Sequence, residues 1–192
     1  MLDVRHGNPP ISKLDAIVGD VRDASAFVFE NARRLRIDPE RLGVWSASAG
    51  GYLALLLAFT EHNAGGGSRF RAAAAYYPAG YDFPQDVARS PELAEGLVAL
   101  QIPDERLDAL SLKHHVSNVA PPTLVVFGTD DFPFIVEPSE TICRELEARS
   151  VAVRRVAMPG IGHEFVGPDG YCAERGAQAR AEVAAWFDRH LR

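Results

Sequence analysis

The sequence has few cysteines and no long apolar run. Two cysteines in 192 residues are too few for a disulfide framework, and we expect Cys143 and Cys172 to be free thiols. No stretch of about 18 apolar residues is present, so no segment is expected to span a membrane. The first ten residues, MLDVRHGNPP, lack the pattern of a secretory signal. We therefore expect a cytoplasmic protein.

The sequence also lacks an excess of positive charge. Its formal net charge is −6, which argues against a protein that binds nucleic acid electrostatically. With 47% hydrophobic residues and no repeat or low-complexity tract, it is typical of a globular domain. A single domain over residues 1–192 is the expectation from length. These properties indicate a single globular domain that does not bind nucleic acid electrostatically.

Strand-like and helix-like patterns alternate along the chain. This alternation predicts an α/β fold, with a mostly parallel sheet flanked by helices. The expected helices cover residues 15–35, 49–60, 138–149 (with Pro138 in the first turn) and 173–191. The expected strands cover residues 42–45, 70–77, 123–128 and 151–158. Residues 82–112 hold short helical pieces, which we interpret as a small cap or insertion.

Residues 43–51, GVWSASAGG, carry the strongest motif. An apolar strand runs into a turn of small residues and then into a helix, the arrangement of a nucleophile elbow. The central Ser48 is the candidate nucleophile, with Ser46 where glycine is commonest. The amide of Ala49 would begin the helix, where partial positive charge favours an oxyanion. Taken alone, the motif is weak, because many tight strand–helix turns match it without any chemistry.

Two further segments follow in the order that a catalytic triad requires. Asp131 comes directly after the strand at 123–128 and could orient a histidine, with Asp130 as the alternate. His163 lies on a glycine-flanked loop after the next strand, and its imidazole is suited to general-base catalysis. Either aspartate could instead cap a turn, and the histidine could be a surface residue. Because active sites of such sheets lie where the strands end, the order Ser48, Asp131, His163 favours a triad.

No metal site is expected. His114 and His115 are adjacent, but no third ligand stands at usable spacing. A triad of this kind needs no cofactor, so none is predicted.

Three phrases resemble the α/β-hydrolase superfamily, in particular its carboxylesterase and lipase type. They are RIDPERLGVWSASAGGYLA, SNVAPPTLVVFGTDD and PGIGHEF, and the likeness is closest to hormone-sensitive-lipase-like and acetyl-xylan or feruloyl esterases. The resemblance implies an α/β-hydrolase fold and a serine hydrolase that cleaves carboxylic esters through an acyl-enzyme. It assigns Ser48 as nucleophile, His163 as base and Asp131 as the orienting acid. A small-molecule ester is the implied substrate.

The resembled enzymes place a His-Gly-Gly oxyanion motif upstream of the nucleophile. Residues 6–8 read His-Gly-Asn, but only 41 residues separate Gly7 from Ser48, too few for the intervening elements. We interpret residues 2–20 as the family's fourth strand and the following helix, so the N-terminal strands and this motif would be lacking. Residues 42–45 would then form an exposed sheet edge. Three explanations are open: the sequence is a truncated gene product, it is a fragment of a longer polypeptide, or a second copy of the chain covers the edge. With Ala49 as the single oxyanion donor, activity would be about 10²–10³-fold lower.

Aromatic residues cluster around the predicted site. Tyr77, Tyr81, Phe132 and Phe165 follow strand ends or triad residues and could line a substrate pocket, or could simply be core residues. The motifs leave two rival functions open. One is an amidase or peptidase that uses the same triad, and the other is a non-catalytic binding module with this fold.

Overall fold

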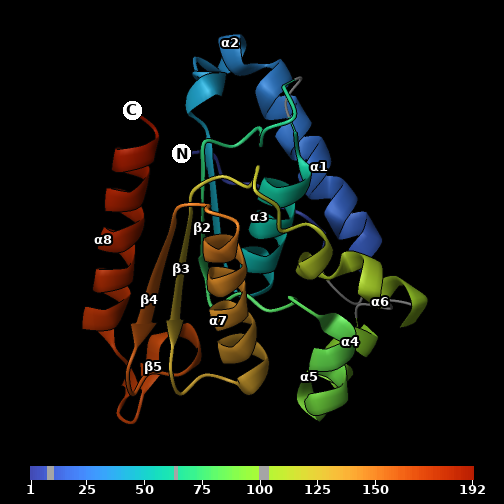
Figure 1. The fold of residues 1–192 in the computed structure, drawn as a ribbon, viewed down its shortest axis with the longest axis vertical. Helices are drawn as coiled ribbons and strands as arrows, with labels where there is room; N and C mark the ends of the chain where they lie inside the picture. The colour runs from blue at the N-terminus through green and yellow to red at the C-terminus, as the bar shows by residue number, and fades with distance from the viewer. Residues whose placement is uncertain (8–10, 63–64, 100–103) are drawn as a thin grey trace.

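The computed structural model describes residues 1–7, 11–62, 65–99 and 104–192, and its centre is a four-stranded parallel sheet (Figure 1). The strand order is β1-β2-β3-β4. The strands are β1 (Gly43–Ala47), β2 (Ala72–Tyr76), β3 (Thr123–Gly128) and β4 (Val153–Met158). Neighbouring strands run parallel, so each must be connected to the next by a crossover, and every crossover contains at least one helix. The predicted α/β fold is confirmed.

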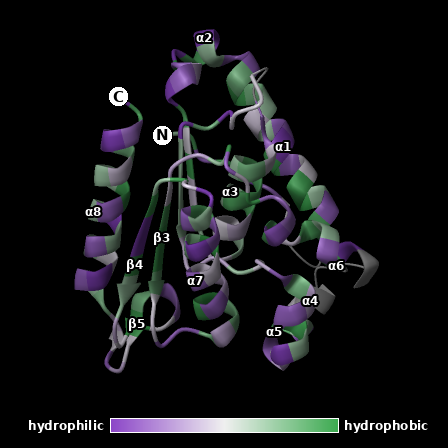
Figure 2. Cartoon of the chain, in the orientation of Figure 1, coloured by the Kyte–Doolittle hydropathy of each residue, from purple (hydrophilic) through white to green (hydrophobic). Residues whose placement is uncertain are grey.

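Helices cover both faces of this sheet (Figure 1). On one face lie α3 (Ala49–Thr60), against β1 and β2, and α7 (Pro133–Ala148), against β3 and β4. On the other lies α8 (Ala173–His190), against β2 and β3. The two central strands are buried along their whole length, and Figure 2 shows the apolar colouring of β3 and α3 beside the alternating colours of α8. The hydrophobic core is therefore a layer on each side of β2 and β3.

The first helical segment is interrupted where the sequence predicted one helix over residues 15–35. The structure has α1 (Leu14–Glu30) and a separate turn, α2 (Ala32–Leu35), followed by a short 3-10 helix, η1 (Pro39–Arg41). The break falls at Asn31, and Arg36 adopts a left-handed conformation with φ 57°. The predicted helix was too long because neither break carries a proline or glycine.

The helix predicted over residues 138–149 begins earlier. The first-turn proline of α7 is Pro133, and Pro138 lies inside the helix. The prediction of Pro138 in the first turn was therefore wrong. Pro133 fits the first helical position because its fixed φ suits the helix and its missing N–H would have no intrahelical acceptor there.

The region interpreted as a cap consists of short helices. These are α4 (Phe83–Arg89), α5 (Pro91–Ala99), α6 (Asp104–Leu110) and the 3-10 helix η2 (Leu112–His114), while residues 100–103 lie outside the described chain. Two hydrogen bonds tie the region to the core: Tyr52 O–H donates to the Leu110 carbonyl at 2.8 Å, and Leu112 N–H donates to the Gly80 carbonyl at 2.9 Å. Its role as a cap stays a prediction.

Strand β1 forms one edge of the sheet. Among the described residues it pairs with β2 alone, and Trp45 is 38% exposed, with its ring edge against Tyr76. Residues 1–7 form no strand, so the interpretation of this segment as a family strand was wrong in that respect. Gly7 N–H instead donates to the Asp20 carboxylate on α1 at 3.0 Å, and Asn8 lies outside the described residues.

The chain between β4 and α8 contains elements that the sequence did not predict. A 3-10 turn, η3 (His163–Phe165), leads into a two-stranded antiparallel hairpin of β5 (Val166–Gly167) and β6 (Gly170–Tyr171). Cys143 and Cys172 are both free, and Cys143 is buried. No helix in the described ranges is long and apolar enough to cross a membrane.

Candidate active site

Ser48 occupies a strained turn between β1 and α3. Its φ is 53° and its ψ −126°, a combination that costs a non-glycine residue about 1–3 kcal/mol. Its N–H donates to the Tyr76 carbonyl at 2.9 Å, which fixes the turn to the end of β2. The turn therefore holds the serine at the carboxyl end of the sheet, the conformation of a nucleophile elbow.

Small residues around the serine make this turn possible. A Cβ added to Gly50 would lie 2.3 Å from Ser46 Oγ, and one added to Gly51 would lie 2.9 Å from the Tyr76 carbonyl oxygen. Larger residues at either position would push α3 away from the sheet. The glycine pair thus sets the close approach of the helix start to β1 and β2.

His163 lies beside Ser48 on the loop that follows β4. Its Nε2 is 3.0 Å from Ser48 Oγ. The loop bends sharply here, with left-handed φ values of 55° at Glu164 and 62° at Phe165. Two backbone bonds hold it: Gly162 N–H donates to the Val166 carbonyl at 2.7 Å, and Cys172 N–H donates to the Phe165 carbonyl at 2.9 Å. The β5–β6 hairpin therefore serves to place the imidazole.

Asp131 completes a continuous line of hydrogen bonds. His163 Nδ1 lies 3.0 Å from both carboxylate oxygens of Asp131, whose side chain is fully buried. Phe132 N–H also donates to Asp131 Oδ1 at 2.7 Å. In the tautomer that satisfies every partner, Nδ1–H donates to Asp131 and Ser48 O–H donates to Nε2. The neighbouring Asp130 instead accepts from the Thr129 hydroxyl at 2.8 Å and is exposed, as expected for a turn residue.

The sequence matches the prolyl oligopeptidase family over residues 13–192. The chain belongs to this family. No curated protein sequence matches it at a significant level. The family and the fold together indicate a serine hydrolase.

Solved structures of esterases share the fold of this prolyl oligopeptidase family member. A hyperthermophilic esterase from the archaeon Pyrobaculum calidifontis is 25% identical, with a TM-score of 0.75, over 99% of this chain and 66% of its own. A truncated carbohydrate esterase from gut microbiota is 19% identical, with a TM-score of 0.74, over 97% of this chain and 72% of its own. Esterase B from Lactobacillus rhamnosis, inhibited by a tributyrin phosphonate, is 19% identical, with a TM-score of 0.74, over 97% of this chain and 64% of its own. The α/β-hydrolase fold implied by the sequence is confirmed, and this chain spans 64–72% of the length of these three structures.

Two of the four predicted pocket aromatics touch the histidine of this family member. The Tyr77 ring centroid lies 4.5 Å from that of His163, and the half-exposed Phe132 ring lies 5.8 Å from it. Burial first, then the charges of Glu164 and Asp131, raise the pKa of Tyr77, so its phenol stays protonated at neutral pH. Tyr77 is thus a neutral wall beside the imidazole.

The other two predicted pocket aromatics are placed differently. Phe165 is buried and packs edge-on against Tyr77, with ring centroids 5.4 Å apart. Tyr81 is partly buried against the core, and its carbonyl accepts from Lys113 N–H at 3.0 Å. Within the described ranges, no hydrogen bond or ring contact joins Tyr81 to Ser48, Asp131 or His163.

A cavity of about 210 Å³ lies beside Phe132, between α4 and the start of α7. Its wall includes Asp86, which the sequence analysis missed. Asp86 lies in a short helix, α4, which packs against α5 and α6. The one available signal was an acidic residue within the mixed segment FPQDVAR.

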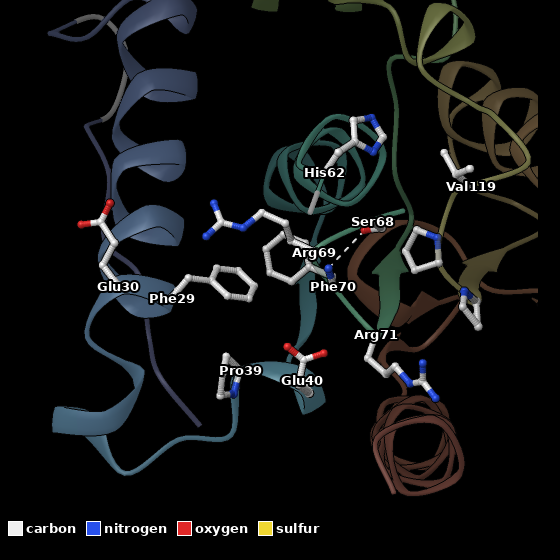
Figure 3. A pocket seen from close by; sticks show the side chains of 12 residues that line it. Phe29, Glu30, Pro39, Glu40, His62, Ser68, Arg69, Phe70, Arg71 and Val119 are labelled. Carbon is white, nitrogen blue, oxygen red and sulfur yellow. Dashed lines mark hydrogen bonds between the residues drawn. The ribbon is translucent and has the colours of Figure 1, made fainter. Parts of the chain in front are cut away.

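A second cavity, of about 630 Å³, lies at the opposite end of the sheet (Figure 3). Arg71, which precedes β2, and Pro121 and Pro122, which precede β3, line it, so it is remote from the triad. Figure 3 shows Arg69 beside Phe29, where its guanidinium lies 4.1 Å from the ring centroid. Among the residues that the structure describes, no three His, Cys, Asp or Glu side chains are grouped to hold a metal ion.

Proposed function

We propose that the chain hydrolyses carboxylic esters of small molecules, with Ser48, His163 and Asp131 as a catalytic triad. The observation that carries this proposal is the unbroken line of 3.0 Å contacts from Ser48 Oγ through the imidazole to Asp131. The strained backbone of Ser48, with φ 53° and ψ −126°, supports it, because strain of this kind clusters at functional sites and is typical of a nucleophile elbow.

The proposed reaction uses each residue in a separate role. His163 Nε2 takes the hydroxyl proton as Ser48 Oγ attacks the ester carbonyl carbon. Asp131 stabilises the imidazolium that forms and keeps its Nδ1–H pointing inward. His163 then gives the proton to the departing alcohol, which leaves an acyl group on Ser48. Water, deprotonated by the same imidazole, releases the acid and restores the serine.

The oxyanion of the tetrahedral intermediate needs donors. Ala49 is the first residue of α3, so its N–H has no acceptor within the helix and is the proposed donor. Gly7 lies in the upstream segment that resembles an oxyanion motif, but its N–H donates a hydrogen bond to the Asp20 carboxylate on α1. With one donor, the proposed activity of this chain alone is about 10²–10³-fold below that of a two-donor site. High turnover of short esters by the monomer would contradict that part of the proposal.

Labelling with a fluorophosphonate probe tests the triad directly. The wild type and Ser46→Ala should be labelled, while Ser48→Ala should not. Ser46→Ala is the matched control, because it removes a hydroxyl two residues away and keeps the turn small. Absence of labelling that depends on Ser48 would favour a non-catalytic binding module.

Peptide or amide hydrolysis is the second candidate, favoured by the match to the prolyl oligopeptidase family. The triad serves both reactions, but an amine is a poorer leaving group than an alcohol. A matched pair of 4-nitrophenyl ester and 4-nitroanilide with the same acyl group separates the two. Faster Ser48-dependent release from the ester supports the first proposal, and comparable release from the anilide supports the second.

A further inference from the structure

The cavity beside Phe132 adjoins the triad and has an aromatic wall. Phe132 is 48% exposed, faces His163 at 5.8 Å and stacks on Phe134 with ring centroids 5.1 Å apart and planes 10° apart. Both rings line the cavity. Phe132 therefore borders both His163 and the cavity, which places the cavity next to the candidate triad.

Asp86 lines the same cavity with an incompletely paired carboxyl group. The residue is 8% exposed, and in the described part of the chain its Oδ2 is buried with no hydrogen-bond partner. A buried polar atom without a partner costs about 1–3 kcal/mol, and structures rarely keep one without a reason. Because Asp86 lines the cavity, a small rotation of its side chain would bring this unpaired oxygen to a donor bound there.

Acidic groups outnumber basic ones around the cavity. Its lining contains Asp86, Glu92 and Glu137 but a single cation, Arg89. Arg89 is already paired, since its guanidinium donates to Glu137 at 3.0 Å across the gap between α4 and α7. The neutral Ser90 hydroxyl donates to Glu92 at 2.9 Å, and no ion pair within the described ranges compensates that negative charge. The cavity therefore attracts positive charge.

We infer that this cavity is a substrate subsite that binds a protonated primary amine, with Asp86 as its counter-ion and Phe132 as its aromatic wall. An ammonium group combines the donors that an unpaired carboxylate lacks with a charge that an aromatic face attracts. A neutral hydroxyl would supply one donor and no charge. The preferred ester would carry the amine at the end distant from the scissile carbonyl. This inference deepens the proposed function and rests on it for the catalytic readout.

The ionisation of Asp86 supports a pH signature. The pKa of Asp86 is raised to about 6, chiefly by burial. The negative charges of Asp82 and Glu137 also raise this pKa, whereas a backbone hydrogen bond from Asp82 and the charge of Arg89 lower it. Asp86 is thus mostly ionised at pH 7 and mostly protonated below pH 5. An alkyl ammonium group stays charged throughout, since its pKa is about 10. The preference for a cation should therefore weaken as the pH falls through about 6.

Binding can be measured without catalysis. The Ser48→Ala variant is titrated with hexylammonium chloride and with 1-hexanol at pH 7.5, with ligand-observed NMR as the readout. We expect hexylammonium to bind about tenfold more tightly, the size of effect typical of a partly buried charge pair with an aromatic face. Adding Asp86→Asn should remove the preference. Adding Asp188→Asn, the same chemical change on α8, which lies across the sheet from α7, should leave it intact (Figure 1).

The catalytic readout compares 4-nitrophenyl 6-aminohexanoate with its near-isostere, 4-nitrophenyl heptanoate. In the wild type the amino ester should show the higher kcat/KM, with the difference lost in Asp86→Asn. Equal binding of hexylammonium and hexanol, or a preference that survives Asp86→Asn, would overturn the inference. If neither ester is cleaved by Ser48, the proposed function fails, and the binding titration still decides the subsite.

Discussion

A methyl group added to Gly128 would lie 1.9 Å from the carbonyl oxygen of Ile161. Gly128 ends β3 just before Asp131, and Ile161 lies in the loop just before His163. The two segments are also joined by Asp130 N–H, which donates to the Ile161 carbonyl at 3.0 Å. This contact sets the distance between the acid and the base of the candidate triad.

Replacing Gly128 by alanine should therefore separate the two loops. We expect Gly128→Ala to lower the free energy of unfolding by about 2–3 kcal/mol, because the added methyl meets rigid backbone. Fluorophosphonate labelling should slow as well, since His163 moves relative to Asp131. Urea denaturation and labelling rates measure the two effects.

Gly19→Ala is the matched control for this substitution. Gly19 lies in α1, and an added Cβ would have nothing within 4 Å. Alanine in a helix is more favourable than glycine, so this variant should gain about 0.5–1 kcal/mol. A Gly128→Ala variant as stable as Gly19→Ala would contradict the steric argument.

The role of Asp131 can be separated from that of its neighbour. Asp131→Asn should lower the rate of ester hydrolysis by about 10⁴-fold, because an amide no longer fixes the tautomer of His163. Asp130→Asn, which changes an exposed turn residue, should change the rate little. A larger loss from Asp130→Asn would assign the orienting acid to the other aspartate. Steady-state hydrolysis of a 4-nitrophenyl ester provides the comparison.

Asp86 should also affect stability in a pH-dependent way. Its pKa is raised from 3.8 to about 6 on folding, so the native state holds the proton more tightly than the unfolded state. Its protonated form therefore favours the fold at low pH, and this benefit is lost as the pH rises through about 6. Asp86→Asn should be more stable than the wild type by about 1–2 kcal/mol at pH 7, with little difference near pH 4. A pH-independent difference in urea unfolding would show that the carboxyl does not titrate this way.

The exposed edge of the sheet leads to a prediction about assembly. We expect a second copy of the chain to cover β1, which gives a particle of twice 20.9 kDa. Trp45→Glu should then yield the monomer, because it places a charge in the edge contact. Phe27→Glu changes a similarly exposed side chain on α1 and should leave the dimer intact. Sedimentation that finds only monomer for the wild type up to its solubility limit would exclude this assembly.

Much of the fold could be predicted because local pattern and tertiary structure agree there. The helix at Ala49–Thr60 and the strand at Thr123–Gly128 have the predicted bounds, since turn residues flank each apolar run. The approach of Ser48, Asp131 and His163 followed from the rule that parallel strands end at one edge. That rule needs only that the strands run parallel, which the alternation of strands and helices along the sequence indicates.

Other features depend on contacts that no local pattern records. The break at Asn31 and the left-handed Arg36 carry no proline or glycine signal. The β5–β6 hairpin has two residues per strand, too few for an alternating pattern to be recognised. The burial of Asp86 is a tertiary property of α4, which packs against α5 and α6, and no periodic pattern in its seven residues indicates it. Tyr81 had the same sequence signal as Tyr77, and only the path of the backbone after β2 distinguishes them.

The crowding between Ser46 and Gly50 has a consequence for how this sequence can change. The serine hydroxyl fills the space that a side chain at residue 50 would need, so the two positions are not independent. Alanine at residue 50 should be harmful on the present background and better tolerated once residue 46 is glycine. The order in which substitutions arise therefore decides which versions of the nucleophile turn a lineage can reach.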